Sequence, residues 1–371
     1  MKIFQVISRV HSSGGAERMV IDLCNELYHL NNEVVLVTFY DVLPDSVYMQ
    51  SLNKRVRHIS LHKRRGFDFT LPIKILKFLL KEKPDIVNTH LSAVLPYFFI
   101  SILLCFRVRF FHTIHNLAER EEPRSFMRLI RLFFMKIRRI VFVSISENTY
   151  NSFLSYYKSK WTELVRNGRS PIVFSSATKK VKEELEILKR DENTRIYLSI
   201  GRIAEQKNFG LLIDAFRCLY EKKENVLLLL IGEEYSNEKA ITKELNERKA
   251  PNTYLLGAKS NIGDYLLNVD CFCLSSTHEG LPITILESLS VGVPIVSTAV
   301  GGIKDIVVDG ENGFLCTTLN VEDYVQTILK LEKLTTKELD KIRDNNKCLF
   351  DSKYSSKMMG ENYFTIYKKY L

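Results

Sequence analysis

The stretch HEGLPITILE contains two glutamates, Glu279 and Glu287, with Gly280 and Pro282 between them. The run CFCLSS before it is typical of a buried strand, and ITILESLSVG is typical of an apolar helix that starts near Pro282 and ends at Gly292. We therefore expect Glu279 in the loop after a strand and Glu287 about one turn into a helix. Carboxylates accept hydrogen bonds from hydroxyl groups, so this junction is a candidate site for a polyhydroxylated ligand.

The start of the expected helix is also a candidate anion site, because backbone N–H groups at a helix N-terminus attract negative charge. The segment concerned is Gly280, Leu281, Pro282 and Ile283. An anion held next to two carboxylates that bind hydroxyls matches a sugar joined to a nucleoside diphosphate. From the residues alone, Glu287 could equally be a capping or buried structural acid.

A second motif, SIGRIAEQKNF, places Gly201, Arg202 and Lys207 between an expected strand and an expected helix. Two cations after a strand that ends in glycine suit a diphosphate, because they neutralise oxygens that gain charge as a bond to phosphate breaks. The alternative is an ordinary solvated surface with no ligand.

Near the start of the chain, RVHSSGGAER brings Gly14 and Gly15 to the beginning of another expected helix. The spacing is not that of a G-x-G-x-x-G dinucleotide motif, but glycines there let backbone amides approach a phosphate or a sugar oxygen. A plain tight turn is the alternative.

These motifs follow short β-branched runs that alternate with longer amphipathic ones, as in βαβ units with a parallel sheet. The alternation occurs in two series, which predicts an α/β fold of two doubly wound Rossmann-like domains. We expect an N-terminal domain over 1–170, a linker over 171–194, a nucleotide-sugar-binding domain over 195–350, and a C-terminal helix over 351–371 that packs back toward the first domain. Ligands of such sheets bind beyond the carboxyl ends of the strands, so the two domains are expected to face each other across a cleft.

The run SSTHEGLPITILESLSVGVPIVSTAVGGIKDIVVDGENGFL, with GRIAEQKN upstream and SGGAER near the start, resembles the retaining GT-B glycosyltransferases of family GT4. The resemblance covers nearly the whole chain and includes an E-x7-E signature, G-R-x4-K, G-x-P and D-G-x-N-G in the family's order. It implies that Glu279 binds hydroxyls of the donor sugar and Glu287 the ribose. It implies likewise that Arg202 and Lys207 bind the diphosphate.

The resemblance extends to FHTIHN, where the family commonly has a histidine that reaches the donor sugar. His115 matches that position best, and the likeness implies a catalytic role for it, as for Glu279, Arg202 and Lys207. His112 falls on the opposite face of an extended strand and is interpreted as structural.

Two further segments bear on the likeness. Ser146 in VSISEN and the pair Asn167-Gly168 match the family, but Arg169-Ser170 stand where it usually has Ile-Asp. This departure puts an acceptor or hinge role of that loop in doubt.

The implied reaction is transfer of a hexose from a nucleotide-diphosphate sugar to a hydroxyl of a glycan or lipid-linked oligosaccharide, with retention of anomeric configuration. No Asp-x-Asp motif or histidine cluster is placed to hold a divalent ion, so we expect no metal and no cofactor besides the nucleotide-sugar substrate. Two rival functions are a nucleotide-sugar epimerase of the same fold and a non-enzymatic module that binds nucleic acid or an anionic surface. No recognition helix or stacking motif supports nucleic acid as a partner.

Charge is uneven along the chain. Residues 1–170 contain 26 Lys and Arg against 14 Asp and Glu, whereas the remainder has 27 against 29. On a helical wheel, RSFMRLIRLFFMKIRR is a basic amphipathic helix. Its cationic stripe is Arg124, Arg128, Arg131, Arg138 and Arg139, and its apolar stripe is Phe126, Leu129, Ile130, Phe133 and Ile137. The stripe of arginines is interpreted as a docking surface for an anionic membrane leaflet or, alternatively, as the solvated face of a helix whose apolar side packs in the core.

Three remaining features bear on location. LPIKILKFLLKEK resembles a second basic amphipathic helix, and LPYFFISILLCFRV is too short to span a membrane and is expected to be a buried helix. The opening MKIFQVISRV is expected to be a strand and not a signal peptide. Seven scattered cysteines without a framework spacing are interpreted as reduced core residues. We therefore expect a cytoplasmic protein, peripheral on the inner face of the cell membrane if the basic helix docks there.

Overall fold

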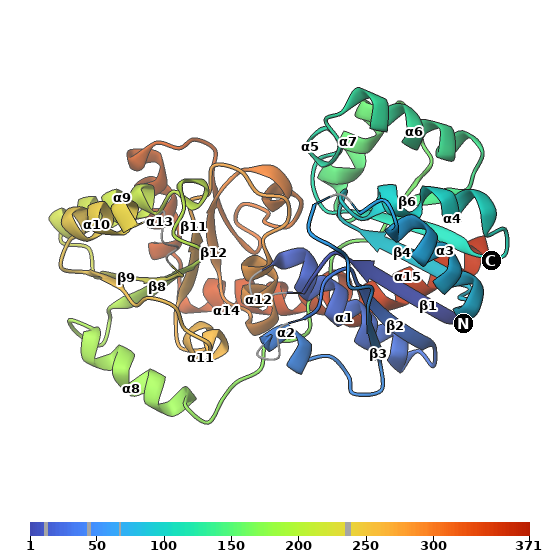
Figure 1. The fold of residues 1–371 in the computed structure, drawn as a ribbon. Coiled ribbons are helices and arrows are strands. Elements are labelled where there is room, and N and C mark those ends of the chain that lie inside the picture. Colours follow the sequence, from blue (N-terminus) through green and yellow to red (C-terminus); the bar gives the residue numbers. More distant parts are fainter. Residues whose placement is uncertain (11–13, 43–45, 67, 234–238) are drawn as a thin grey trace. The chain divides into compact units, whose positions relative to one another are not determined.

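The chain forms two compact units in a computed structural model that describes residues 1–10, 14–42, 46–66, 68–233 and 239–371 (Figure 1). Unit 1 comprises Met1–Ser170 together with Lys353–Leu371, and unit 2 comprises Pro171–Ser352. Each unit is built on a parallel sheet covered by helices. The α/β class and the two Rossmann-like sheets are confirmed.

Unit 1 contains a seven-stranded sheet in which every described strand pair is parallel. From edge to edge its strands are β3 (Arg57–Ser60), β2 (Glu33–Thr38), β1 (Lys2–Ile7), β4 (Ile86–His90), β5 (Arg109–Ile114), β6 (Ile140–Ser144) and β7 (Thr162–Leu164). The strand order reverses between β1 and β4, so the carboxyl ends of these two strands form the switch point where ligands of doubly wound sheets bind.

Hydrophobic residues on both faces of this sheet pack against helices, as expected for parallel strands with near-continuous apolar runs. The helices of unit 1 are α1 (Gly15–His29), α2 (Val47–Gln50), α3 (Leu71–Glu82), η1 (Leu95–Phe98), α4 (Phe99–Leu104), α5 (Ala118–Glu121), α6 (Ser125–Lys136), α7 (Glu147–Tyr157) and α15 (Ser356–Tyr370).

The C-terminal helix α15 lies in unit 1 and packs on α1 (Figure 1). Gly360 permits this contact, because a Cβ there would lie 2.4 Å from the Cβ of Glu26 on α1. On its sheet-facing side, the Tyr363 hydroxyl lies 3.0 Å from Oγ1 of Thr113 in β5, and the Tyr367 hydroxyl accepts a hydrogen bond from Gln5 in β1. The last helix therefore contributes two tyrosine hydroxyls to the buried hydrogen bonds of unit 1.

Unit 2 contains a six-stranded parallel sheet of the same kind. Its strands, from edge to edge, are β10 (Thr253–Leu255), β9 (Val226–Ile231), β8 (Arg195–Ile200), β11 (Cys271–Leu274), β12 (Ile295–Thr298) and β13 (Gly313–Cys316). Here the strand order reverses between β8 and β11, which places the switch point of unit 2 at their carboxyl ends.

The helices of unit 2 are α8 (Thr178–Leu188), η2 (Glu205–Lys207), α9 (Phe209–Glu221), α10 (Lys239–Arg248), α11 (Ile262–Leu266), α12 (Ile283–Val291), η3 (Gly301–Asp305), α13 (Val321–Glu332) and α14 (Thr336–Leu349), and η4 (Phe350–Tyr354) carries the chain back to unit 1. The segment 171–194, expected as a linker, carries α8 and belongs to unit 2. Asp264 of α11 anchors this segment to unit 2. Its carboxylate accepts hydrogen bonds from the backbone N–H and hydroxyl of Ser175 and from the hydroxyl of Thr178.

Helix α6 does not have the orientation that the helical wheel favours, because Arg131 is buried together with Phe134 and Met135, while Arg124 and Arg138 are exposed. Arg131, in the middle of the cationic stripe, is 1% exposed, and its guanidinium lies 3.5 Å from the buried carboxylate of Glu122 and 3.3 Å from the Tyr157 hydroxyl. Arg128 donates to the backbone oxygen of Tyr156. The prediction of a solvent-facing arginine stripe is therefore wrong at its centre, because Arg131 pairs with the buried carboxylate of Glu122 and does not face solvent.

Four of the five residues of the apolar stripe are exposed, with Phe126 at 72% and Leu129 at 64%, whereas Ile130 packs against the core. The run LPYFFISILLCFRV, expected as a buried helix, forms η1 and α4 and is buried on one side only, because Leu104 and Phe106 are exposed. Across the described ranges, no helix is both long enough and apolar enough to cross a bilayer.

All seven cysteines are unpaired thiols. Five of them are buried as expected, but Cys218 is half-buried and Cys348 is exposed. Cys348 is therefore not a core residue.

Candidate functional site

Both motifs of the second half follow the two central strands of unit 2. Gly201, Arg202 and Lys207 come after β8, and Glu279 comes after β11, the strand paired with β8. The carboxyl ends of parallel neighbours meet at one edge of the sheet. The topology thus brings together residues that lie more than seventy positions apart in the sequence.

An ion pair links the two motifs. The Lys207 ammonium lies 2.6 Å from Oε1 of Glu279, with the side chains 18% and 8% exposed. The Ser276 hydroxyl donates to the same oxygen at 2.7 Å. Charge-assisted bonds of this length hold both side chains in defined positions, so the Glu279 carboxylate is fixed at the switch point.

Backbone contacts fix the two loops against each other. The Ser275 hydroxyl donates to the carbonyl oxygens of Lys207 and Asn208, at 2.8 and 2.9 Å. In the other direction, the Thr277 N–H donates to the Gln206 carbonyl, and the Gln206 side chain donates to the His278 carbonyl. The ion pair therefore sits on a rigid frame rather than on two independent loops.

Gly201, the residue directly after β8, packs closely within this frame. A Cβ at this position would lie 3.2 Å from the Lys207 stem, and a Cβ at Gly232 would lie 2.3 Å from the Gly201 carbonyl oxygen. Arg202, the other expected cation, is exposed on the surface of unit 2. An exposed guanidinium on the same loop as Lys207 can contribute to the binding of an anionic ligand.

Two glycines that sequence reasoning did not single out pack directly on the Glu279 loop. A Cβ at Gly301 would lie 1.8 Å from the Glu279 carbonyl oxygen, and Gly301 has a φ of 52°. The Gly302 N–H donates to the Gly280 carbonyl at 3.0 Å, where a Cβ would lie 2.0 Å away. The signal in the sequence is the glycine pair directly after the strand PIVST.

Helix α12 begins at Ile283 after Pro282, which is its N-cap residue, and ends at Gly292 in the left-handed conformation. The segment from Gly280 and Leu281 leads into its first turn, so the partial positive charge of the helix start lies beside the Glu279 loop. Glu287 lies on the same helix, one turn in, and is 9% exposed. The geometry therefore places both glutamates on one loop-to-helix junction.

In unit 1, His115 directly follows β5 and contacts a histidine that sequence reasoning missed. Its Nε2 lies 3.1 Å from Nδ1 of His90, the last residue of β4, and Nε2 of His90 lies 2.8 Å from the Gln5 side-chain oxygen. The Gln5 oxygen also accepts from Asn88, and the Gln5 nitrogen donates to the Tyr367 hydroxyl. The sequence signal for His90 is its position as the polar residue that ends the strand pattern DIVNTH.

This chain of bonds fixes the tautomer of both histidines. Because the Gln5 oxygen is the acceptor, Nε2 of His90 carries the proton, and burial lowers the pKa of His90 well below its usual range, so the ring is neutral. Nδ1 of His90 is then the acceptor for the Nε2 proton of His115. Burial lowers the pKa of His115 to about 4, so His115 is also neutral, with Nδ1 as its lone-pair nitrogen.

His112 has the structural environment expected of it. It is buried within β5, its Nδ1 lies 2.9 Å from the Thr89 hydroxyl, and its Nε2 faces the Glu121 carboxylate at 3.7 Å. The lowering of the His112 pKa by burial outweighs the opposite effect of Glu121. His112 therefore stabilises the sheet rather than a ligand.

The first-strand loop is only partly described, because residues 11–13 of RVHSSGGAER lie outside the described ranges. Gly14 is the N-cap residue of α1 and Gly15 its first residue. A Cβ at Gly14 would lie 2.8 Å from the Glu17 carboxyl carbon. The two glycines thus lie at the start of α1, the position in which the sequence predicts them.

The loop that departs from the family pattern is anchored within unit 1. Arg169 forms an ion pair with Asp22 of α1 at 2.9 Å, and the Ser170 hydroxyl donates to the same carboxylate at 3.0 Å. Gly168 packs against the Ser355 backbone, where a Cβ would lie 2.3 Å from the carbonyl oxygen. Ser146 caps α7. These contacts give the loop a structural role.

No group of three or more potential metal ligands occurs in the part of the chain that the structure describes. Lys207 and Glu279 form a charged pair at the switch point of unit 2, and Arg202 is an exposed cation of the loop after β8. Whatever anion binds there would be met by these cations and by the start of α12.

Each half of the chain matches the model of a glycosyltransferase family. Residues 180–348 match the family described as glycosyl transferases group 1, and residues 13–171 match glycosyltransferase family 4. Neither match is to a family of epimerases or nucleic-acid-binding proteins.

Two curated relatives have named roles. A UDP-Gal:alpha-D-GlcNAc-diphosphoundecaprenol alpha-1,3-galactosyltransferase of Escherichia coli is 26% identical over 301 residues, covering 78% of this chain and 76% of the relative. The capsular polysaccharide biosynthesis glycosyltransferase CapM of Staphylococcus aureus is 26% identical over 345 residues, covering 89% of each chain.

Among solved structures, Anabaena HepE in complex with UDP and glucose covers the whole of both chains with a TM-score of 0.79 and 18% identity. This likeness concerns the fold and extends over both sheets.

Proposed function

This chain belongs to the glycosyltransferases of the GT-B fold, and from that premise we propose that it transfers a hexose from a nucleoside-diphosphate sugar to an acceptor hydroxyl with retention of anomeric configuration. The observation that carries the proposal is the Lys207–Glu279 ion pair at the switch point of unit 2, beside the start of α12. It provides a carboxylate for sugar hydroxyls and a cation for phosphate within one rigid frame.

The donor is a uridine-diphosphate sugar in this proposal. The Escherichia coli relative uses UDP-Gal, and HepE binds UDP. Glu279 accepts hydrogen bonds from sugar hydroxyls and Glu287 from the ribose. Arg202, Lys207 and the first-turn amides of α12 bind the diphosphate, with Gly201, Gly280, Leu281, Pro282 and Ile283 shaping the backbone around it.

Transfer then proceeds by lengthening of the bond between the anomeric carbon and the diphosphate oxygen. Lys207 and Arg202 stabilise the negative charge that accumulates on the leaving diphosphate, and this stabilisation is larger in the transition state than in the ground state. The acceptor oxygen forms its bond to the anomeric carbon on the face that the diphosphate leaves. Its proton passes to a diphosphate oxygen, which balances the reaction without a metal ion.

His115 contributes through its lone-pair nitrogen. A neutral histidine with Nδ1 unprotonated accepts a hydrogen bond from a sugar hydroxyl but cannot donate one through that atom. In this proposal Gly14 and Gly15 at the start of α1 provide backbone N–H groups for the donor or acceptor.

The acceptor is a glycan or a lipid-linked oligosaccharide in surface-polysaccharide synthesis. The Escherichia coli relative acts on an undecaprenol-linked substrate, and CapM functions in capsule synthesis. An epimerase would change the free donor without any acceptor, and that outcome is tested together with transfer.

The test begins with binding. A panel of UDP and GDP sugars is screened for thermal stabilisation, and a donor at about a hundred times its Kd should stabilise the fold by ~2.7 kcal/mol. Glu287→Ala should abolish the shift, whereas Glu322→Ala, at an exposed glutamate of the same unit, should retain it. The donor identified is then incubated with and without acceptor, and the anomer of the product is read by NMR.

Three results would contradict the proposal. One is a panel without any stabilising nucleotide sugar, and another is an equal shift in Glu287→Ala and wild type. The third is conversion of the donor to its epimer when no acceptor is present.

A further inference from the structure

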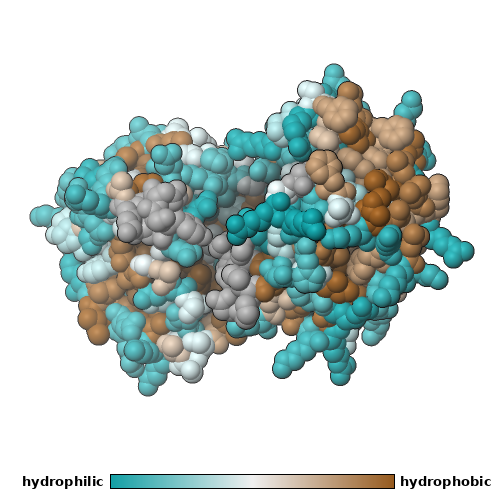
Figure 2. All heavy atoms as spheres, viewed as in Figure 1, coloured by the Kyte–Doolittle hydropathy of each residue, from teal (hydrophilic) through white to brown (hydrophobic). Residues whose placement is uncertain are grey.

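Unit 1 carries a continuous apolar face on helices α3, α4 and α6 (Figure 2). Its exposed side chains are Ile73, Leu80, Ile100, Leu103, Leu104, Phe106, Phe126, Leu129, Phe133 and Ile137. Single exposed hydrophobic residues are ordinary, but a contiguous apolar patch on a folded protein marks an interaction site. We call this set the α3–α4–α6 face.

Direct contacts join the three helices. The rings of Phe99 on α4 and Phe134 on α6 stack with centroids 5.1 Å apart. Arg139, just after α6, donates to the carbonyl oxygens of Ile102 and Cys105, and its guanidinium lies over the Phe106 ring. Helix α3 packs on α4. The face is therefore one surface, not three separate patches.

Buried polar contacts hold the apolar side of α6 outward. Arg131 is enclosed with Glu122 and Tyr157 on the inner side of the helix. Rotating α6 to bury Phe126 and Leu129 would expose that ion pair and separate Arg131 from Glu122, and breaking a buried pair is strongly unfavourable. The exposure of the apolar stripe is thus built into the fold.

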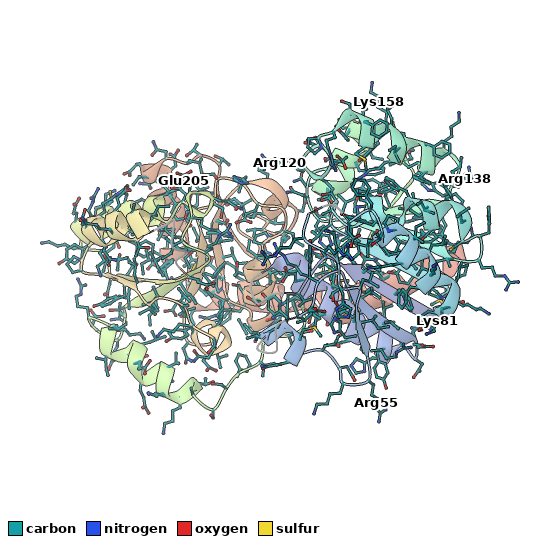
Figure 3. All side chains as sticks on the ribbon, in the orientation of Figure 1. Arg55, Lys81, Arg120, Arg138, Lys158 and Glu205 are labelled. Atoms are coloured by element: carbon teal, nitrogen blue, oxygen red, sulfur yellow. The ribbon has the colours of Figure 1, made fainter. Side chains whose placement is uncertain are left out.

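The charge on and around α4 and α6 has one sign, and the single acid of α3, Glu82, is paired with Lys2. The chain has no Asp or Glu from residue 86 to 118 or from 123 to 146. Exposed lysines and arginines lie on or beside the same helices, namely Lys74, Lys77, Lys81, Arg107, Lys136 and Arg138. Figure 3 shows Lys81 and Arg138 pointing outward from unit 1. An apolar surface with a basic rim complements an anionic lipid leaflet.

We infer that the α3–α4–α6 face docks on an anionic bilayer by inserting its apolar side chains at the level of the headgroups, while the basic rim binds lipid phosphates. A second copy of the chain is disfavoured as the occupant, because a two-fold contact would bring the basic rims together without acids to neutralise them. This inference goes beyond the proposed transfer reaction. It makes the apolar residues of α6, rather than the arginine stripe, the part of the helix that inserts into the membrane, and Arg138 alone of that stripe belongs to the basic rim.

The experiment is co-sedimentation with vesicles of equal parts phosphatidylglycerol and phosphatidylcholine, and with vesicles of phosphatidylcholine alone. Wild type should bind the anionic vesicles, and the triple variant Phe126→Asp, Leu129→Glu, Phe133→Glu should bind on the order of a hundredfold more weakly. Replacing Lys74, Lys77 and Lys81 by Gln should weaken binding about fivefold per lysine at low salt and less at high salt.

A matched control changes an exposed hydrophobic residue elsewhere. Ile187→Glu, at an 82% exposed position of α8, should bind vesicles like wild type. Circular dichroism and thermal melting check that each variant is folded. Because no donor or acceptor is used, the outcome is independent of the proposed reaction.

A gain of signal provides a second readout that needs no loss-of-function variant. Phe126→Trp should show a blue-shifted emission and quenching by brominated phosphatidylglycerol when vesicles are added, against the fixed background of Trp161, the single native tryptophan. Absence of quenching, or equal vesicle binding by wild type and the folded triple variant, would overturn the inference. So would a concentration-dependent dimer that the triple variant abolishes while vesicle binding is absent.

Discussion

The carboxyl edges of the two parallel sheets use different chemistry, at the switch point in unit 2 and at and next to the switch point in unit 1. In unit 2, the carboxyl ends of β8 and β11 hold a charged pair, Lys207 and Glu279, with exposed Arg202 beside it. In unit 1, the residues at and after the ends of β4 and β5 hold two neutral histidines, His90 and His115, tied to Gln5 in the buried core.

The difference indicates a division of tasks. Fixed cations are effective where negative charge develops in a reaction. Neutral rings with defined donor and acceptor atoms instead discriminate between hydroxyl positions, because a mismatch leaves a buried polar group without a partner. In the proposed reaction, unit 2 would therefore bind the leaving diphosphate, and unit 1 would orient a polyhydroxylated group.

The strongest test of this contrast removes the fixed cation. Lys207→Ala should lower kcat by ~10²–10³, the usual cost of losing one group that stabilises developing charge. Lys222→Ala, at a lysine 45% exposed and paired with Glu322 on the same unit, should leave kcat unchanged. Initial rates at saturating donor measure both. A kcat close to wild type in Lys207→Ala would show that Lys207 does not stabilise the charge that develops on the leaving group.

The next largest effect concerns sugar recognition by Glu279. Glu279→Gln should cost about 1–3 kcal/mol of transition-state stabilisation with the true donor and less with donors epimeric at a contacted hydroxyl, because the amide no longer accepts at both atoms. Comparison of kcat/KM across the epimers measures it. Equal losses with every donor would place Glu279 outside the sugar pocket and leave it only as the partner of Lys207.

Local patterns were sufficient to predict the positions of some of these residues. Glu279 after a strand, Glu287 one turn into a helix and the end at Gly292 follow from apolar runs, a proline and a glycine within fifteen residues. The same holds for the parallel sheets, since βαβ alternation is itself a local signal. What the sequence could not provide was contact between distant segments.

Helix α6 illustrates that limit. Its wheel separates arginines from hydrophobic residues but does not say which side faces inward, and the apolar side is the ordinary choice. The answer depends on Glu122 and Tyr157, which lie outside the helix and become buried only in the folded unit. His90 was missed for the same reason, because its pairing with His115 requires the strand order of the sheet.

A substitution at Gly301 tests a contact between two segments that are distant in the sequence, the Gly301 turn and the Glu279 loop. Gly301→Ala should destabilise unit 2 by about 1–3 kcal/mol, because the new Cβ would lie 1.8 Å from the Glu279 carbonyl oxygen and push the loop away. Gly310→Ala is the matched control, since Gly310 also has a positive φ of 80° but nothing lies within 4 Å of its Cβ position. Urea unfolding followed by circular dichroism compares them, and equal destabilisation would assign the effect to backbone strain alone.

The effect spread over the widest range of conditions is the pH dependence that the neutral histidines impose on unit 1. Burial lowers the pKa of His115 to about 4, against 6.5 for the unperturbed side chain. Between these values the unfolded chain binds a proton that the folded chain does not. The free energy of unfolding should therefore rise with pH by up to ~1.4 kcal/mol per pH unit for this residue and level off above the unperturbed value.

Urea titrations from acid to neutral pH, followed by the fluorescence of Trp161, report on unit 1 alone, because that tryptophan donates to the Ile140 carbonyl within it. His115→Gln keeps a polar side chain but removes the titrating group, so the slope should decrease. His29→Gln, at an exposed position, should keep the wild-type slope. A slope in His115→Gln equal to that of wild type would mean that His115 is not held neutral by burial. Its Nδ1 would then not be fixed as an acceptor. Unit 1 would not have a neutral site to set against the charged site of unit 2.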